Sequence, residues 1–105
     1  MLTPELRSRL DEEIRSHPVV IYMKGTALFP RCGFSAAALQ ALEPYGTVHA
    51  VDVLAEPELR DAIKEYSNWP TIPQVYIRGK FVGGSDIVRD LAERGDLEKL
   101  IKGEG

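Results

Sequence analysis

A continuous run of five apolar residues, Val19–Met23, constrains the fold of this chain more than any other feature. The run is rich in β-branched side chains, which favours a strand, and no polar residue interrupts it. A strand with this composition is covered on both faces of its sheet. The rest of the 105-residue chain must therefore supply helices for both faces.

Helical patterns flank this strand along the chain. Thr3 supplies a capping hydroxyl and Pro4 suits the first helical position, so a helix is expected to open there and to end at His17-Pro18. Apolar residues at helical spacing, with proline, glycine or acidic residues at the boundaries, predict four more helices. They begin at Gly33, at Glu56, at Ser85 acting as a cap, and after Gly95.

The remaining extended segments complete a sheet. Thr47–Val53 is expected to form a second strand, and Gln74–Arg78 is expected to join Phe81-Val82 through a two-residue Gly79-Lys80 link in a β-hairpin. A parallel βαβ unit followed by a ββα unit is the thioredoxin-like arrangement. The chain is therefore predicted to be one α/β domain over residues 1–105, a four-stranded mixed sheet flanked by helices.

Charge and hydropathy argue against nucleic-acid binding and against a membrane protein. The net charge is −3 and the charges are interspersed, which gives no basic surface for nucleic acid. No apolar run approaches the roughly 18–20 residues that span a bilayer, so no membrane association is expected. The acidic residues near the N-terminus are unlike a signal or transit peptide. We expect a cytoplasmic protein, or one in a matrix-like compartment if a presequence was removed.

Cys32 is the only cysteine, so any disulfide or multi-cysteine metal site needs a partner from outside the chain. It lies where a loop meets a helix, and the free N–H groups and dipole of a helix start stabilise a thiolate. Lys24 and Arg31 offer positive charge, and Gly33 leaves room for another sulfur to approach. The alternative is that Cys32 is a small buried apolar residue without chemistry.

Four segments in order resemble the signatures of monothiol glutaredoxins of the Cys-Gly-Phe-Ser type. They are Lys24-Gly25-Thr26, Pro30–Ser35, Asn68–Gln74 and Gly83–Asp86, and the likeness extends from about residue 6 to residue 101. Two departures stand out. Ala27-Leu28-Phe29 replaces the commoner Pro-Glu-containing loop, which leaves partner choice open, and Ser85 stands where some members carry a second cysteine.

The resemblance implies a site for glutathione. Lys24 and Arg60 match positions that bind the glycyl carboxylate, and Ile72, before an expected cis-Pro73, would pair its backbone with the cysteinyl part. The γ-glutamyl end would be held by Ser85 and Asp86 at a helix start, which match the family's pair for that group. Taken without the family, Lys24 and Arg60 are equally consistent with surface charges and Ser85-Asp86 with a plain helix cap, whereas residues 71–73 favour an ordinary turn. The tyrosines, Trp69, His17 and His49 are interpreted as structural.

The resemblance also implies a [2Fe–2S] cluster. Such a cluster takes four ligands, often all thiolates, and this chain offers only Cys32. Two chains and two glutathione molecules would supply four, so the family implies a cluster-bridged homodimer that delivers its cluster to apo iron–sulfur proteins. A BolA-family partner is left open.

The alternative is an oxidoreductase acting on glutathionylated proteins through Cys32 and a second glutathione. Because Ser35 stands where dithiol relatives carry a second cysteine, only weak activity of this kind is expected.

Overall fold

The computed structural model describes residues 1–103 and contains the expected order of helices and strands. Two helix starts follow directly from the sequence. The Oγ1 of Thr3 accepts a hydrogen bond from the N–H of Leu6 at 3.2 Å, and Pro57 occupies the first turn of its helix. In chain order the elements are α1 (Pro4–Ser16), β1 (Val19–Met23), α2 (Gly33–Leu42), the 3₁₀ turn η1 (Glu43–Tyr45), β2 (His49–Asp52), α3 (Pro57–Ser67), β3 (Gln74–Ile77), β4 (Lys80–Gly83), α4 (Ser85–Glu93) and α5 (Asp96–Lys102).

The four strands form one mixed sheet in the order β2-β1-β3-β4. β1 pairs with β2 in parallel and with β3 antiparallel, so that Val20 lies opposite His49 on one side and Tyr76 on the other. β4 returns antiparallel to β3. The parallel β1–α2–β2 unit and the β3–β4 hairpin confirm the thioredoxin-like α/β fold.

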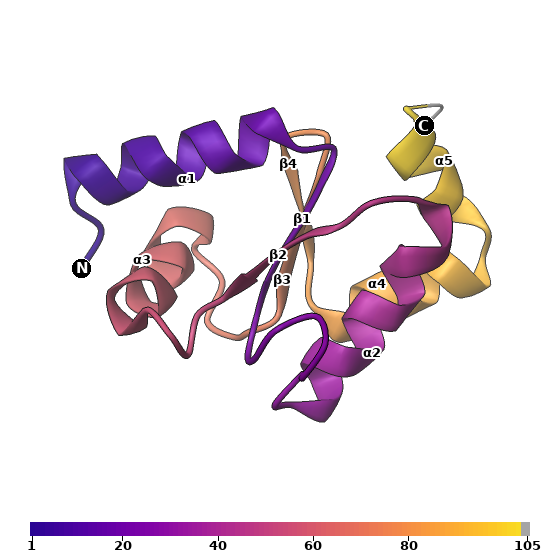
Figure 1. Ribbon diagram of the computed structural model, residues 1–105. Helices are drawn as coiled ribbons and strands as arrows, with labels where there is room; N and C mark the ends of the chain where they lie inside the picture. Colours follow the sequence, from indigo (N-terminus) through magenta and orange to yellow (C-terminus); the bar gives the residue numbers. More distant parts are fainter. Residues whose placement is uncertain (104–105) are drawn as a thin grey trace.

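The side chains of β1 divide between two cores, as its uninterrupted apolar sequence requires. Val20 and Tyr22 pack with residues of α1 and α3, whereas Val19, Ile21 and Met23 pack with residues of α2, α4 and α5. All five are at most 3% exposed. Figure 1 shows α1 and α3 on one side of the sheet and the other three helices on the opposite side. Within residues 1–103, no helix combines the length and apolar character needed to cross a membrane.

The hairpin turn differs from the sequence-based prediction. The two turn residues are Arg78-Gly79, with φ of 50° and 81°, and Lys80 already belongs to β4. Two consecutive left-handed residues give the turn that matches the twist of paired strands. Arg78 is held in this conformation by its N–H, which donates to the Pro18 carbonyl at 2.8 Å, and by its Nε, which donates to the Ile101 carbonyl at 3.2 Å.

Two further boundaries were predicted wrongly. The second strand is His49–Asp52 rather than residues 47–53, because β1 offers paired partners only from Val20 to Met23. The N-cap of α4 is Gly84, and Ser85 is the first residue of that helix. The side chain of Ser85 therefore does not cap the helix, and its hydroxyl is left for another role.

Candidate functional site

Cys32 is the N-cap residue of α2, in an extended conformation with φ −149° and ψ 132°. Its thiol is free and partly exposed. A Cβ built on the following residue, Gly33, would meet no atom within 4 Å, so the space beside this glycine is open. The position of Cys32 at a helix start agrees with the sequence prediction.

The surroundings lower the pKa of the Cys32 thiol below its ordinary value. The largest cause is the backbone N–H of Ser35 at the helix start, and the N–H of Phe34 and the hydroxyl of Ser35 act in the same direction. Burial acts in the opposite direction, and the positive charge of Lys24 adds a smaller lowering. The thiolate is therefore stabilised mainly by the unpaired amides of the helix start.

Ser35 links this helix to the end of β1. Its side chain is fully buried, and its Oγ accepts a hydrogen bond from the N–H of Lys24 at 3.1 Å. With that acceptor role filled, its hydroxyl hydrogen remains available for the sulfur of Cys32. A serine here thus orders the site and stabilises the thiolate, but it supplies no second thiol.

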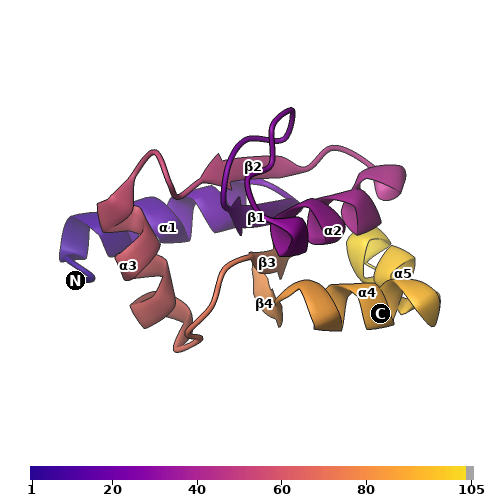
Figure 2. The ribbon, with the colours of Figure 1, turned by 90° about the horizontal axis from the view of Figure 1, so that it is seen from below.

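The loop before Cys32 is a closed hairpin-like turn. The N–H of Arg31 donates to the Lys24 carbonyl at 2.8 Å, and Thr26 and Phe29 exchange two further hydrogen bonds at 3.0 and 3.2 Å. Gly25 allows this closure, since its φ is +93° and an added Cβ would lie 2.5 Å from the carbonyl oxygen of Phe29. Figure 2 shows the loop between β1 and α2 projecting from the body of the fold.

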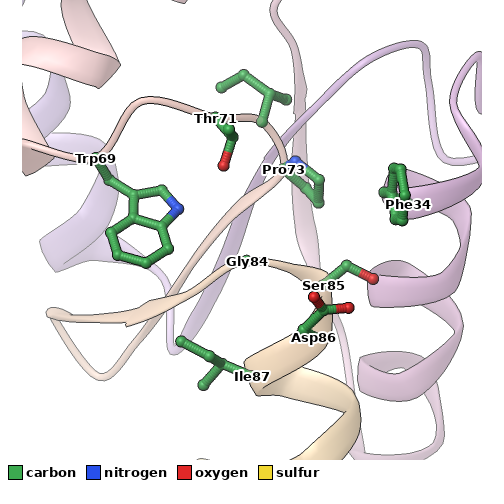
Figure 3. A pocket seen from close by; sticks show the side chains of 9 residues that line it. Phe34, Trp69, Thr71, Pro73, Gly84, Ser85, Asp86 and Ile87 are labelled. Carbon is green, nitrogen blue, oxygen red and sulfur yellow. The ribbon is translucent and has the colours of Figure 1, made fainter.

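A pocket of about 270 Å³ lies between the start of α2, the loop before β3 and the start of α4. The expected cis peptide bond is present between Ile72 and Pro73. Figure 3 shows the ring of Trp69 on one side of the pocket, Phe34 on the other, and Ser85 and Asp86 below them. The lining residues are Phe34, Trp69, Thr71, Ile72, Pro73, Gly84, Ser85, Asp86 and Ile87.

Two polar atoms of this pocket are buried without a hydrogen-bond partner among residues 1–103. They are the hydroxyl oxygen of Ser85 and the indole nitrogen of Trp69. A buried polar group in this state costs about 1–3 kcal/mol, which a polar ligand in the pocket would recover. The sequence analysis interpreted Trp69 as structural, and it does pack against Phe81, with ring centroids 5.7 Å apart. Its unsatisfied nitrogen is the part that the sequence analysis missed.

The structure places three of the six predicted site residues in one pocket and three outside its lining. Ile72, Ser85 and Asp86 line the same pocket, and Lys24 acts on Cys32 through its charge. Cys32 itself does not line the pocket, which begins two residues further on at Phe34. Arg60 lies on α3 outside the pocket lining, and its Nε is buried without a partner in the described chain.

Metal ligands are not clustered in the part of the chain that the structure describes. No group of three or more His, Cys, Asp and Glu side chains is arranged there to hold a metal ion. His17 and His49 lie together as stacked rings with centroids 3.8 Å apart, and Nε2 of His49 is 3.2 Å from a carboxylate oxygen of Glu13.

Comparison with known proteins gives a consistent result. The glutaredoxin family model matches residues 19–82. A monothiol glutaredoxin described as ycf64-like, from Synechocystis, is 48% identical, with 96% of this chain and 95% of that protein covered. The mitochondrial monothiol glutaredoxin-5 of Saccharomyces cerevisiae is 45% identical over 96% of this chain and 70% of its own length. The solution structure of reduced poplar apo GrxS14 superposes with a TM-score of 0.85 at 43% identity, covering 97% of this chain and 94% of that one.

Proposed function

This chain belongs to the monothiol glutaredoxins, and from that premise we propose that it carries a [2Fe–2S] cluster between two copies, with glutathione as co-ligand, for delivery to apo iron–sulfur proteins. One observation carries the proposal. A single activated thiol, Cys32, lies two residues before a pocket whose buried polar groups lack partners. The thiol supplies one cluster ligand, and the pocket holds the molecule that supplies the next.

The pocket suits glutathione, which carries two carboxylates, an ammonium group and a thiol. The Ser85 hydroxyl and the indole N–H of Trp69 are donors in need of an acceptor, and a carboxylate provides one. The first turn of α4 adds backbone N–H groups, and the carboxylate of Asp86 complements an ammonium group. These residues would hold the γ-glutamyl end.

The rest of the tripeptide would extend towards Cys32. The backbone of Ile72 would hold the cysteinyl part, next to the cis bond that shapes this wall of the pocket. Lys24 would hold the glycyl carboxylate, and Arg60 would join it from α3. The buried Nε of Arg60, which has no partner in residues 1–103, is a donor available for that purpose.

The chain's own residues favour a bound metal cluster in one further respect. A metal-ligating cysteine must be deprotonated, and the amides of Ser35 and Phe34 already lower the pKa of Cys32. With one thiolate per chain and one per glutathione, two chains supply the four ligands of a [2Fe–2S] cluster. Because two of the four are exchangeable small molecules, the cluster can leave, which suits a carrier. The acceptors and a cytoplasmic location stay predictions, as does a BolA-type partner.

A second function is supported by the lowered pKa of Cys32 and the open space beside Gly33. The thiolate would attack the glutathione sulfur of a protein mixed disulfide, forming a Cys32–glutathione disulfide and releasing the protein as a thiolate. A second glutathione thiolate would then attack, giving glutathione disulfide and restoring Cys32. Ser35 cannot resolve the intermediate within the chain, so we expect this activity to be weak.

Anaerobic reconstitution with iron, sulfide and glutathione tests the carrier proposal. The protein should become a dimer with about one cluster per two chains, followed by visible absorption and by sedimentation. Cys32→Ser should abolish the cluster, because it removes the only protein thiolate. Ser16→Ala, which changes an exposed hydroxyl on α1, is the matched control and should behave as the unaltered chain. A stable cluster formed without any low-molecular-weight thiol would contradict the proposal.

A further inference from the structure

A second pocket, of about 530 Å³, lies between the edge strand β4 and the helices α4 and α5. Its volume is roughly twice that of the pocket at Ser85, and it falls within the range of about 300–1,000 Å³ that small-molecule sites have. Cys32 does not line this second pocket, and the two pockets meet at Ile87, which lines both. We call the second pocket the β4 groove.

The walls of the β4 groove are mainly apolar. Phe81 and Val82 come from β4, and Ile87, Leu91 and Leu100 come from the two helices. Phe81 is 36% exposed and Ile87 is 41% exposed, although both are large and apolar. Exposed apolar side chains that gather in one hollow mark a place where another molecule binds.

The charged residues that line the groove are both cations. Arg78 lies in the β3–β4 turn and Lys80 is the first residue of β4, so the positive charge belongs to the turn end of the strand. Within residues 1–103, neither forms a salt bridge. The Nε of Arg78 donates to the Ile101 carbonyl, which holds the guanidinium in place and leaves its other N–H groups for a ligand. The opposite end of β4, Gly83, lies against Ile87, since a Cβ added there would be 2.7 Å from that side chain.

No carboxylate among residues 1–103 offsets this charge in the lining of the groove. The acidic residues of the two helices that form its walls are Asp86, Asp90, Glu93, Asp96 and Glu98. Three of them are paired elsewhere, with Arg94 or Lys102, and Asp86 lines the pocket at Ser85. The groove therefore combines apolar walls with positive charge at one end, which complements a ligand that has an apolar body and an anionic head.

We propose that the β4 groove binds a free aliphatic carboxylate of medium chain length. The carboxylate accepts hydrogen bonds from Arg78, which can bind it through two parallel N–H groups, and is attracted by Lys80. The chain lies along β4 towards Ile87 and is removed from water by the apolar walls. The inference goes beyond the proposed function and does not depend on it, since neither Cys32 nor glutathione takes part.

Both parts of the ligand are needed to match the groove. An uncharged lipid would leave the two cations without a partner, and a short acid such as acetate would leave the apolar walls in contact with water. A protein partner is less well matched, because a stable protein interface buries about 800 Å² on each side, whereas this site is a single hollow of small-molecule size.

The first test titrates acetate, octanoate and decanoate into the full chain, below the concentrations at which they form micelles, and locates binding by backbone amide NMR shifts. Decanoate should bind roughly 4- to 16-fold more tightly than octanoate, because each further buried methylene adds up to about fourfold, and acetate should not bind measurably. The shifts should centre on β4, α4 and α5 and persist in excess glutathione. Equal affinities for octanoate and decanoate would overturn the proposal, as would shifts that centre on residues 69–86 and disappear when glutathione is added.

The second test reverses one charge. Lys80→Glu should weaken decanoate binding roughly 2- to 30-fold, since it replaces an exposed attraction by a repulsion, and Lys80→Arg should retain most of the affinity. Lys99→Glu makes the same change in net charge at an exposed position of α5 outside the groove lining, so it is the matched control and should leave the affinity unchanged. Equal weakening by both reversals would show that net charge alone governs binding, and no weakening by Lys80→Glu would remove the anionic anchor; either result overturns the proposal. The chain-length series uses the unaltered chain and decides the question even if a variant fails to fold.

Discussion

Replacing Ser85 with alanine removes a buried hydroxyl oxygen that has no hydrogen-bond partner among residues 1–103. The side chain is 6% exposed and lies at the first position of α4, where its hydroxyl does not cap the helix. An unsatisfied hydroxyl in such a place costs about 1–3 kcal/mol. Its removal leaves only a small void, so we expect the free protein to keep its free energy of unfolding or to gain on the order of 1 kcal/mol.

The same substitution should weaken glutathione binding. If the Ser85 hydroxyl donates to a carboxylate of the ligand, the lost hydrogen bond to a charged group is worth about 1.5–3 kcal/mol. That range corresponds to roughly a 10- to 150-fold higher dissociation constant. Calorimetric titration of the apo-protein with glutathione measures the affinity, and urea unfolding of the same samples measures the stability.

The opposite directions of these two effects make the test specific. A substitution that merely damaged the fold would lower stability and affinity together. Ser16→Ala, at an exposed hydroxyl on the other side of the sheet, controls for the general effect of losing a serine. Unchanged glutathione affinity together with a less stable protein would show that Ser85 serves the fold alone, and would refute this assignment.

Three further predictions follow from the site. Lys24→Ala and Arg60→Ala should each weaken glutathione binding roughly 2- to 30-fold in calorimetry, because each removes a cation from a partly screened carboxylate site; unchanged affinity in both would make them surface charges. The rate of Cys32 alkylation should rise with pH around a midpoint below that of an ordinary thiol, since the pKa of Cys32 is lowered. Ser35→Ala should move that midpoint upwards; the same midpoint in this variant would show that the Ser35 hydroxyl does not lower the pKa of Cys32. Gly25→Ala should lower the free energy of unfolding, measured with urea, by about 1–3 kcal/mol, because its φ of +93° and the carbonyl of Phe29 at 2.5 Å exclude a Cβ. An unchanged urea midpoint would show that the loop changes conformation to accommodate the Cβ.

Much of the fold could be predicted from local sequence patterns. The five apolar residues of β1 require cover on two faces, and the structure supplies a core on each side of the sheet. The start of α1 at Thr3-Pro4 and the start of α3 near Pro57 follow from capping and proline geometry. Cys32 at the start of α2 is predictable for the same reason, since the helix pattern begins at the next residue.

The errors arise where a distant contact decides the local structure. A left-handed arginine at the hairpin turn is unfavourable in isolation, and Arg78 adopts it because Pro18 and Ile101, far away in the sequence, accept its hydrogen bonds. Ser85 has the sequence features of a cap, but β4 runs to Gly83 and shifts the cap to Gly84. The indole nitrogen of Trp69 became a candidate only once its burial without a partner was known.

Carrier and enzyme are separated most directly by two rates measured on one preparation of the reconstituted protein. The first is cluster transfer to an apo-ferredoxin, and the second is turnover of a glutathionylated substrate, both compared with a dithiol glutaredoxin. With Ser35 in place of a resolving thiol and Cys32 two residues before the proposed glutathione pocket, we expect rapid transfer and low turnover. Turnover equal to that of the dithiol protein, with no detectable transfer, would contradict the assignment of this chain as an iron–sulfur carrier.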